Sequence, residues 1–129
     1  MKNLKLAIDL ACQSKDEKSF YFCCAAKRSD GPLVFSVNHN VSSQKIPQHH
    51  AEARVLRKCN YGSVLYVARV LKDRKTLAIA KPCIFCQNFI KNKGVKKVYF
   101  TIDNRRYGLW KINNNLWTEY ELRHNFRVI

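Results

Sequence analysis

The sequence has no run of apolar residues close to the roughly 18 to 20 that a membrane-spanning helix requires. Its first segment, residues 1–18, lacks the long apolar stretch and the small-residue cleavage site of an export signal. Internal repeats, low-complexity tracts and linkers are also missing. These absences exclude a helical membrane protein and a repeat array, and we expect a single soluble, cytoplasmic domain over residues 1–129.

Acidic residues are scarce. Nine Asp and Glu oppose 24 Lys and Arg, which gives a formal net charge of +15 and a pI near 9.8. The excess is distributed over residues 54–58, 69–75, 91–97 and 104–111 and is not confined to a tail, so we interpret it as surface charge of the folded domain. Such a surface attracts polyanions, of which nucleic acid is the usual one. The alternative is that the charge reflects a generally basic proteome or serves solubility.

The six cysteines do not form the dense pattern of a secreted disulfide framework. Two lie three residues apart in the segment Cys-Ile-Phe-Cys (83–86), two are adjacent, and two stand alone in apolar surroundings. We expect the four outside the Cys-x-x-Cys segment to be buried, reduced thiols: Cys12, Cys23, Cys24 and Cys59.

The first half of the chain alternates helical and extended patterns. Apolar residues at helical spacing predict an amphipathic helix over residues 2–13. Two aromatic and β-branched runs, residues 19–27 and 32–38, flank an Asp-Gly turn and predict a β-hairpin. The polar segment 39–48 is a predicted loop that leads to a second helix over residues 49–60.

The second half predicts a buried central strand over residues 63–71, because that segment is nearly all apolar or β-branched. A third helix over residues 83–93 ends at a glycine and is followed by a strand over 95–102. Residues 105–112 can return as its antiparallel partner. Leu116, Tyr120, Arg123 and Phe126 fit one face of a last helix, although the last residues are strand-like. The whole pattern predicts an α/β layer structure with a sheet of about five strands.

A candidate metal site is formed by the two predicted helix N-termini. Cys83 and Cys86 follow a proline, so both sulfurs lie on one side of a first helical turn, where the pair is either a metal site or a redox pair. His50 lies in the first turn of the preceding helix. If the two helices are parallel on one face of the sheet, the three side chains converge as zinc ligands and leave a fourth, catalytic position open. A structural zinc would need a fourth protein ligand, and His39 and His49 are poorly placed for it.

Glu52 lies beside this ligand set. A carboxylate next to a zinc-activated water can accept the proton of that water and deliver it to a reacting base, which makes Glu52 a candidate proton shuttle. The alternative is a first-turn carboxylate that only stabilises the helix dipole.

Two motifs, His-Ala-Glu at 50–52 and Pro-Cys-Ile-Phe-Cys at 82–86, resemble the signature of the zinc-dependent cytidine deaminase superfamily. The resemblance covers roughly residues 2–102. It implies a three-layer α-β-α cytidine deaminase-like fold with a mixed sheet, Zn²⁺ on His50, Cys83 and Cys86, and Glu52 as the catalytic proton shuttle of a hydrolytic deamination. Histidine as the first ligand is shared by deoxycytidylate, tRNA adenosine and polynucleotide cytidine deaminases, whereas an antiparallel return after residue 102 is similar to free-nucleoside and toxin-type deaminases.

The charge favours a polymeric substrate, because a free nucleotide carries few charges whereas a single strand presents a phosphate backbone and exposed bases. Basic and aromatic residues alternate in 104–111, although its two aromatic rings are equally compatible with a strand core. In the loop before the second helix, family members often contact the sugar through an asparagine. The candidate substrate-binding residues are Asn38, Asn40, Lys45, His49, Arg105, Arg106, Tyr107 and Trp110.

The sequence therefore predicts a zinc-dependent hydrolase that converts cytosine to uracil in single-stranded nucleic acid, with DNA favoured over RNA as the substrate partner. One alternative is a free cytidine or deoxycytidylate deaminase. The other is a non-catalytic, basic zinc module that binds nucleic acid. Whether the chain forms a homo-oligomer stays open.

Overall fold

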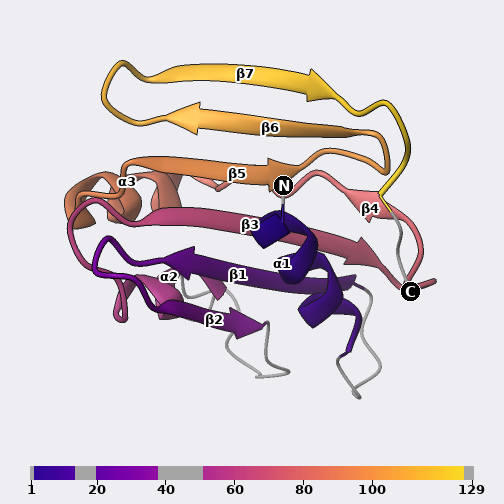
Figure 1. Ribbon diagram of the computed structural model, residues 1–129, viewed down its shortest axis with the longest axis horizontal. Helices are drawn as coiled ribbons and strands as arrows, with labels where there is room; N and C mark the ends of the chain where they lie inside the picture. Colours follow the sequence, from indigo (N-terminus) through magenta and orange to yellow (C-terminus); the bar gives the residue numbers. More distant parts are fainter. Residues whose placement is uncertain (1, 14–19, 38–50, 127–129) are drawn as a thin grey trace.

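The computed structural model describes residues 2–13, 20–37 and 51–126, which form one sheet covered by helices (Figure 1). None of the helices in these residues is long and apolar enough to cross a membrane. The elements are, in chain order, α1 (Lys2–Cys12), β1 (Phe20–Lys27), β2 (Leu33–Val37), α2 (Ala51–Leu56), β3 (Val64–Leu71), β4 (Leu77–Ala78), α3 (Ile84–Lys93), β5 (Lys97–Thr101), β6 (Arg106–Lys111) and β7 (Leu116–Glu121).

The described strands form one seven-stranded mixed sheet with the order β2-β1-β3-β5-β6-β7, and the short strand β4 pairs with β3. Strands β3 and β5 are parallel, whereas every other pair is antiparallel. The predicted mixed α/β sheet is confirmed, but it has two more strands than expected. The additions are β4, which is too short to have a sequence pattern, and β7.

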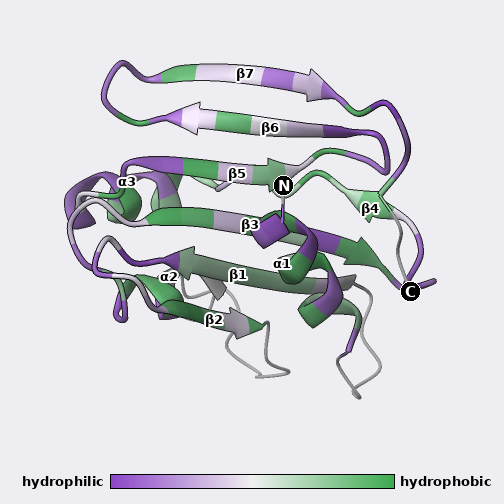
Figure 2. Cartoon of the chain, viewed as in Figure 1, coloured by the Kyte–Doolittle hydropathy of each residue, from purple (hydrophilic) through white to green (hydrophobic). Residues whose placement is uncertain are grey.

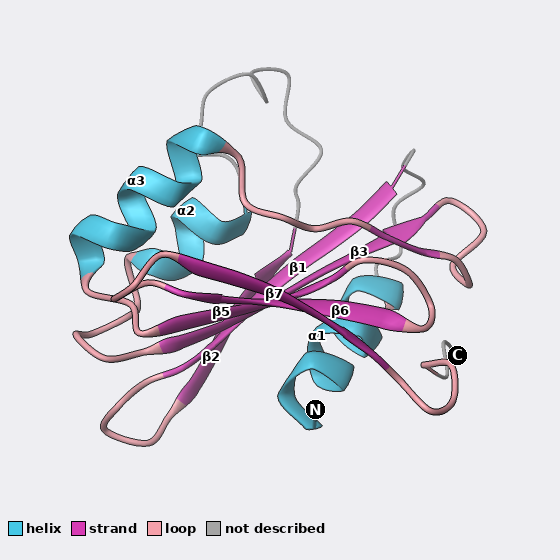
Figure 3. Cartoon of the chain, turned by 90° about the horizontal axis from the view of Figure 1, so that it is seen from above, coloured by secondary structure: helices cyan, strands magenta, loops and turns pink. Residues whose placement is uncertain are grey.

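Helix α1 covers one face of the sheet and α2 and α3 cover the other, which gives the predicted three layers (Figure 3). Successive side chains of β3 point to opposite faces of the sheet, so this one strand contributes to the core on both sides. Leu65 and Val67 point into the core under α2 and α3, whereas Ala68 and Val70 belong to the core under α1. All four side chains are buried, so the expectation of a central strand buried on both faces is confirmed.

The predicted N-terminal helix and hairpin are present, but α2 ends at Leu56, before the expected Asn60. The backbone N–H groups of Arg57 and Lys58 donate to the carbonyls of residues three earlier, which tightens the chain into a turn. The Asn60 side chain then bonds to Ser29 in the β1–β2 turn. This long-range contact draws the chain out of the helix.

Helix α3 agrees with the prediction at both ends. Cys83 is its N-cap residue, with an extended backbone (φ −68°, ψ 166°). Gly94 is its C-cap, in the left-handed conformation (φ 78°) that glycine adopts without steric cost.

The predicted C-terminal helix is wrong, because β7 continues the sheet instead. Asn115 takes a left-handed conformation (φ 49°) in a tight turn that reverses the chain after β6. Strand pairing then places Trp117 opposite Trp110 and Tyr120 opposite Tyr107. Both aromatic pairs are stacked, with ring centroids 4.5 and 5.2 Å apart. These cross-strand pairs stabilise the strand over a helix.

Candidate metal and catalytic site

The N-termini of α2 and α3 lie at the same edge of the sheet. Helix α2 leads into β3 and α3 leads into β5, and these two strands are parallel neighbours. The helices pack against each other, and the loops that follow them are joined by hydrogen bonds from Gly62 N–H to the Gly94 carbonyl and from Lys96 N–H to the Ser63 carbonyl, both 2.8 Å. Because the C-terminal ends meet at the start of β3 and β5, the N-terminal ends lie toward the carboxyl ends of these strands. This is the arrangement that the predicted site requires.

Cys83 and Cys86 occupy the first turn of α3 in different environments. Cys83 is exposed, whereas Cys86 is fully buried in the core under α2 and α3. The segment before them is fixed, since Ala80 N–H donates to the Thr101 carbonyl at the end of β5 (2.9 Å). The Gln87 side chain also donates to the Pro82 carbonyl (2.9 Å). The two sulfurs thus come from a hydrogen-bonded turn beside the end of β5.

Cys83 and Cys86 can supply two of the four ligands of a tetrahedral zinc ion. Two thiol side chains at positions i and i+3 are a usual pair of ligands for tetrahedral zinc. No group of three His, Cys, Asp or Glu side chains that could hold a metal is present among the described residues. The predicted third ligand, His50, lies outside them, directly before the first residue of α2. In the sequence, His50 therefore adjoins the N-terminus of α2, which lies at the same edge of the sheet as the cysteine pair.

Four predicted substrate-binding residues belong to the segment between β2 and α2. Asn38, Asn40, Lys45 and His49 lie outside the described residues. Glu52 is the second residue of α2, and its side chain is not among those described.

Arg105 and Arg106 lie at the expected edge, but acidic side chains surround them. They stand at the start of β6, which runs antiparallel to β5 and so begins near the end of β5. Arg106 forms ion pairs with Asp103 (2.9 Å) and Glu119 (3.6 Å). Arg105 approaches Glu121 (3.5 Å). Hydrogen bonds from the Arg105 backbone and the Arg106 side chain lower the pKa of Asp103, so this carboxylate stays charged and offsets the arginines.

Tyr107 and Trp110 do not form the expected base-stacking platform. Trp110 is fully buried, stacks on Trp117 with an interplanar angle of 6°, and donates its indole N–H to Asn115 Oδ1 (3.0 Å). It is a core residue, and the proposal that it binds substrate is corrected. Tyr107 points to the opposite face of the sheet, where it lies between the rings of Tyr99 and Tyr120.

Other residues beside the cysteines were missed by sequence reasoning. Phe85 lies between the cysteines, and its side chain is 61% exposed. The Lys81 ammonium lies 4.5 Å from the centroid of the Trp117 ring. Phe85 and Lys81 are within two residues of Cys83, so proximity along the chain was the available signal.

Comparisons with known proteins agree with this geometry. Residues 1–102 match the family described as the cytidine and deoxycytidylate deaminase zinc-binding region. A search of curated proteins finds no match. The matched segment includes both motifs and ends with β5 and the residue after it. The chain therefore belongs to the cytidine and deoxycytidylate deaminase family, and it is a zinc-dependent hydrolytic deaminase.

Proposed function

We propose that this deaminase converts cytosine to uracil in single-stranded nucleic acid, with DNA favoured over RNA. The net charge of +15 carries the proposal, because it exceeds what binding one nucleotide needs and suits a chain of phosphates. The exposed ring of Phe85 beside Cys83 supports it, since an aromatic ring can stack on a base turned out of a strand.

The reaction forms a bond from C4 of the base to a water oxygen and breaks the bond from C4 to the exocyclic nitrogen, which leaves as ammonia. His50, Cys83 and Cys86 would hold the zinc, which would supply a Lewis acid that lowers the pKa of the attacking water toward about 7. Glu52 takes one proton from the water and delivers it to the ring nitrogen. It then moves the proton of the new C4 hydroxyl to the departing amine, so that C4 keeps a carbonyl oxygen and ammonia leaves. Cys86 anchors the first turn of α3 in the core and so fixes the position of Cys83.

A free cytidine or deoxycytidylate deaminase is the second candidate, and the pairing of Arg105 and Arg106 favours it. The carboxylates of Asp103, Glu119 and Glu121 offset the positive charge of the segment that was expected to follow a phosphate backbone. A substrate with one phosphate does not require that segment.

The test compares purified, zinc-loaded protein on a cytosine-containing DNA oligonucleotide, the matching RNA, deoxycytidine monophosphate and cytidine. Glu52→Gln is the control, because it removes the proton shuttle without removing a predicted zinc ligand. We expect uracil in the DNA oligonucleotide first and a loss of rate of about 10²- to 10⁴-fold or more in Glu52→Gln. Product from the two small substrates alone would replace the proposal with the second candidate.

A further inference from the structure

The end of the sheet away from the cysteine pair carries a concentration of positive charge. Four segments meet there, and we name them together the basic end: residues 27–30, 57–63, 91–97 and 111–115. They contain nine Lys and Arg and a single acidic residue, Asp30. All four lie at the left side of Figure 1, and Figure 2 shows the start of β5 there as strongly hydrophilic.

Lysines form a line across the strands of this end. Lys27 is in register with Val64, Val64 with Lys97, and Lys97 with Lys111. Neighbouring strands are about 4.8 Å apart, so Lys97 and Lys111 are close like charges. Like charges directly opposite each other destabilise a sheet, and the line therefore has no structural benefit.

The one acidic residue of the basic end offsets the charge of Arg28 alone. Asp30 is engaged by Arg28, whose Nε and Nη2 donate to the two carboxylate oxygens, both at 2.9 Å. Arg28 also donates to the Lys58 carbonyl (2.6 Å) and so connects the β1–β2 turn to the end of α2. Within the described part of the chain, Lys93 and Lys96 make no ion pair. Their charges remain available to an anion from outside.

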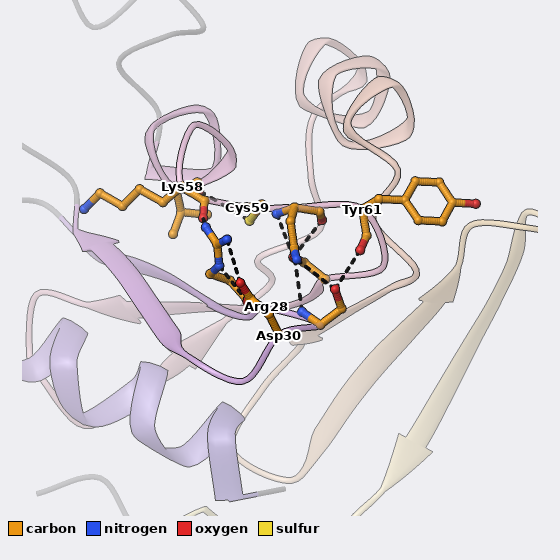
Figure 4. Close-up of polar contacts among 9 residues, drawn as sticks. Arg28, Asp30, Lys58, Cys59 and Tyr61 are labelled. Atoms are coloured by element: carbon orange, nitrogen blue, oxygen red, sulfur yellow. Dashed lines mark hydrogen bonds and ion pairs between the residues drawn. The ribbon is translucent and has the colours of Figure 1, made fainter.

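Tyr61 gives the basic end an exposed aromatic ring. Its side chain is 84% exposed, and Figure 4 shows the ring pointing away from the polar contacts around Arg28. The Tyr61 carbonyl accepts a hydrogen bond from Ser29 Oγ (2.9 Å). The ring lies beside Gly94, where an added Cβ would come within 2.4 Å of Tyr61 Cδ2. The ring thus lies against Gly94 on one side, while most of its surface is free to contact a ligand.

We propose that the basic end binds a single-stranded nucleic acid, with lysines on the phosphates and Tyr61 stacked on an unpaired base. Lys93 and Lys96, which make no ion pair within the described residues, and the exposed ring of Tyr61 fit this ligand, whereas a duplex offers no base face to the ring. This inference rests on the proposed function in one respect, because the bound strand continues to the active site only if the substrate is a single-stranded nucleic acid. The length of α3, about 15 Å, separates the two positions. A strand that reaches both needs about five stacked nucleotides at about 3.4 Å each.

Two variants with different salt signatures test the proposal: Lys93→Ala/Lys96→Ala and Tyr61→Ala. Fluorescence anisotropy measures binding of each to a labelled single-stranded DNA of about 12 nucleotides. We expect the double variant to bind about tenfold more weakly at physiological salt and to lower the log–log salt slope by about 1.4, since two phosphate contacts are lost. Tyr61→Ala should bind at least about fivefold more weakly with the slope unchanged, because base stacking does not release counterions.

Lys2→Ala/Lys72→Ala is the matched control, because it removes two exposed lysines from α1 and the β3–β4 turn. It should bind almost as the parent protein does. A double variant at 93 and 96 that matches this control in affinity and slope would overturn the inference. So would equal binding of duplex DNA, or binding to phosphatidylserine vesicles with none to the oligonucleotide.

Photo-crosslinking to a bromouracil-containing oligonucleotide separates this inference from the proposed function. We expect a crosslink on the tryptic peptide 59–69, which includes Tyr61, whether or not the oligonucleotide is deaminated. A crosslink without deamination would support the basic end and remove the proposed substrate. Deamination of the oligonucleotide with no crosslink on this peptide and no effect of Tyr61→Ala would keep the substrate and remove the basic end.

Discussion

Replacement of Cys86 by alanine tests whether this thiol is a metal ligand, and Cys23 provides a matched control. Both side chains are fully buried, Cys86 under α2 and α3 and Cys23 under α1. Burial raises the pKa of Cys23 to about 12, so it remains a neutral thiol at neutral pH and does not act as a ligand. Either substitution removes one buried sulfur from a packed core. The two variants therefore differ in their effect on zinc alone.

The expected difference follows from mass action. Removing the sulfur costs each variant about 1 kcal/mol of unfolding free energy, comparable to one buried methylene group. Zinc at a hundred times its dissociation constant adds about 2.7 kcal/mol to the parent protein, and Cys86→Ala loses that contribution. At about 3 to 5 °C per kcal/mol for a chain of this size, Cys86→Ala should melt roughly 10 °C below Cys23→Ala in zinc.

The measurement is thermal melting by circular dichroism, with and without a chelator, together with the zinc content of each purified protein. In the chelator, the two variants should melt at similar temperatures, because the metal contribution is absent from both. Equal melting temperatures in zinc and a full equivalent of bound zinc in Cys86→Ala would refute the assignment of Cys86 as a ligand.

Three further predictions concern the fold. Raising the pH above 9.0 should lower the free energy of unfolding, because the unfolded chain releases the Cys23 proton that the native thiol holds up to about pH 12. Cys23 should contribute about 1.4 kcal/mol per pH unit to this slope. The slope should be shallower by that amount in urea titrations of Cys23→Ala, where Cys12 and Cys59, whose pKa values are also raised by burial, still contribute. Trp110→Ala should cost about 3 to 5 kcal/mol in urea denaturation, and a cost below 1 kcal/mol would contradict its place in the core. Gly94→Ala should cost about 1 to 2 kcal/mol from its positive φ and also weaken oligonucleotide binding by displacing Tyr61. Gly31→Ala, with open space around it, should change stability without changing binding.

Local patterns predicted most of the fold because each depends on residues close in sequence. The apolar spacing of α1, the Asp-Gly turn of the first hairpin and the glycine after α3 all act within one or two turns of chain. The position of the cysteine pair also followed, because two helix-to-strand units with parallel strands have both helix N-termini at one edge. The shared edge of the two helix N-termini was predictable from the connectivity once the strand between the helices was identified.

Long-range pairing explains what the sequence did not predict. The spacing of Leu116, Tyr120 and Phe126 is compatible with a helix, and the contact of Trp117 with Trp110 that favours the strand depends on the β6–β7 turn. The charge of Arg106 was misjudged in part for the same reason, although its closer partner, Asp103, is only three residues away in the sequence. The net charge of the sequence does not show which arginines are ion-paired, and the pairing of β6 with β7 brings Glu119 to Arg106 from the neighbouring strand.

The dipoles of the two parallel helices have their negative ends at the basic end, and this explains only some of its lysines. Lysines near the end of α3, such as Lys91 and Lys93, are expected there because they interact favourably with the helix dipole. The dipole does not explain Lys97 and Lys111, which lie on strands and oppose each other. Lys111→Glu should relieve this repulsion and raise the free energy of unfolding by about 0.2 to 1 kcal/mol in urea denaturation. The same variant should bind single-stranded DNA more weakly. Higher stability with unchanged affinity for single-stranded DNA would show that the line of lysines does not take part in binding. Higher stability together with weaker binding would show that the lysines reduce the stability of the sheet and increase its affinity for the strand.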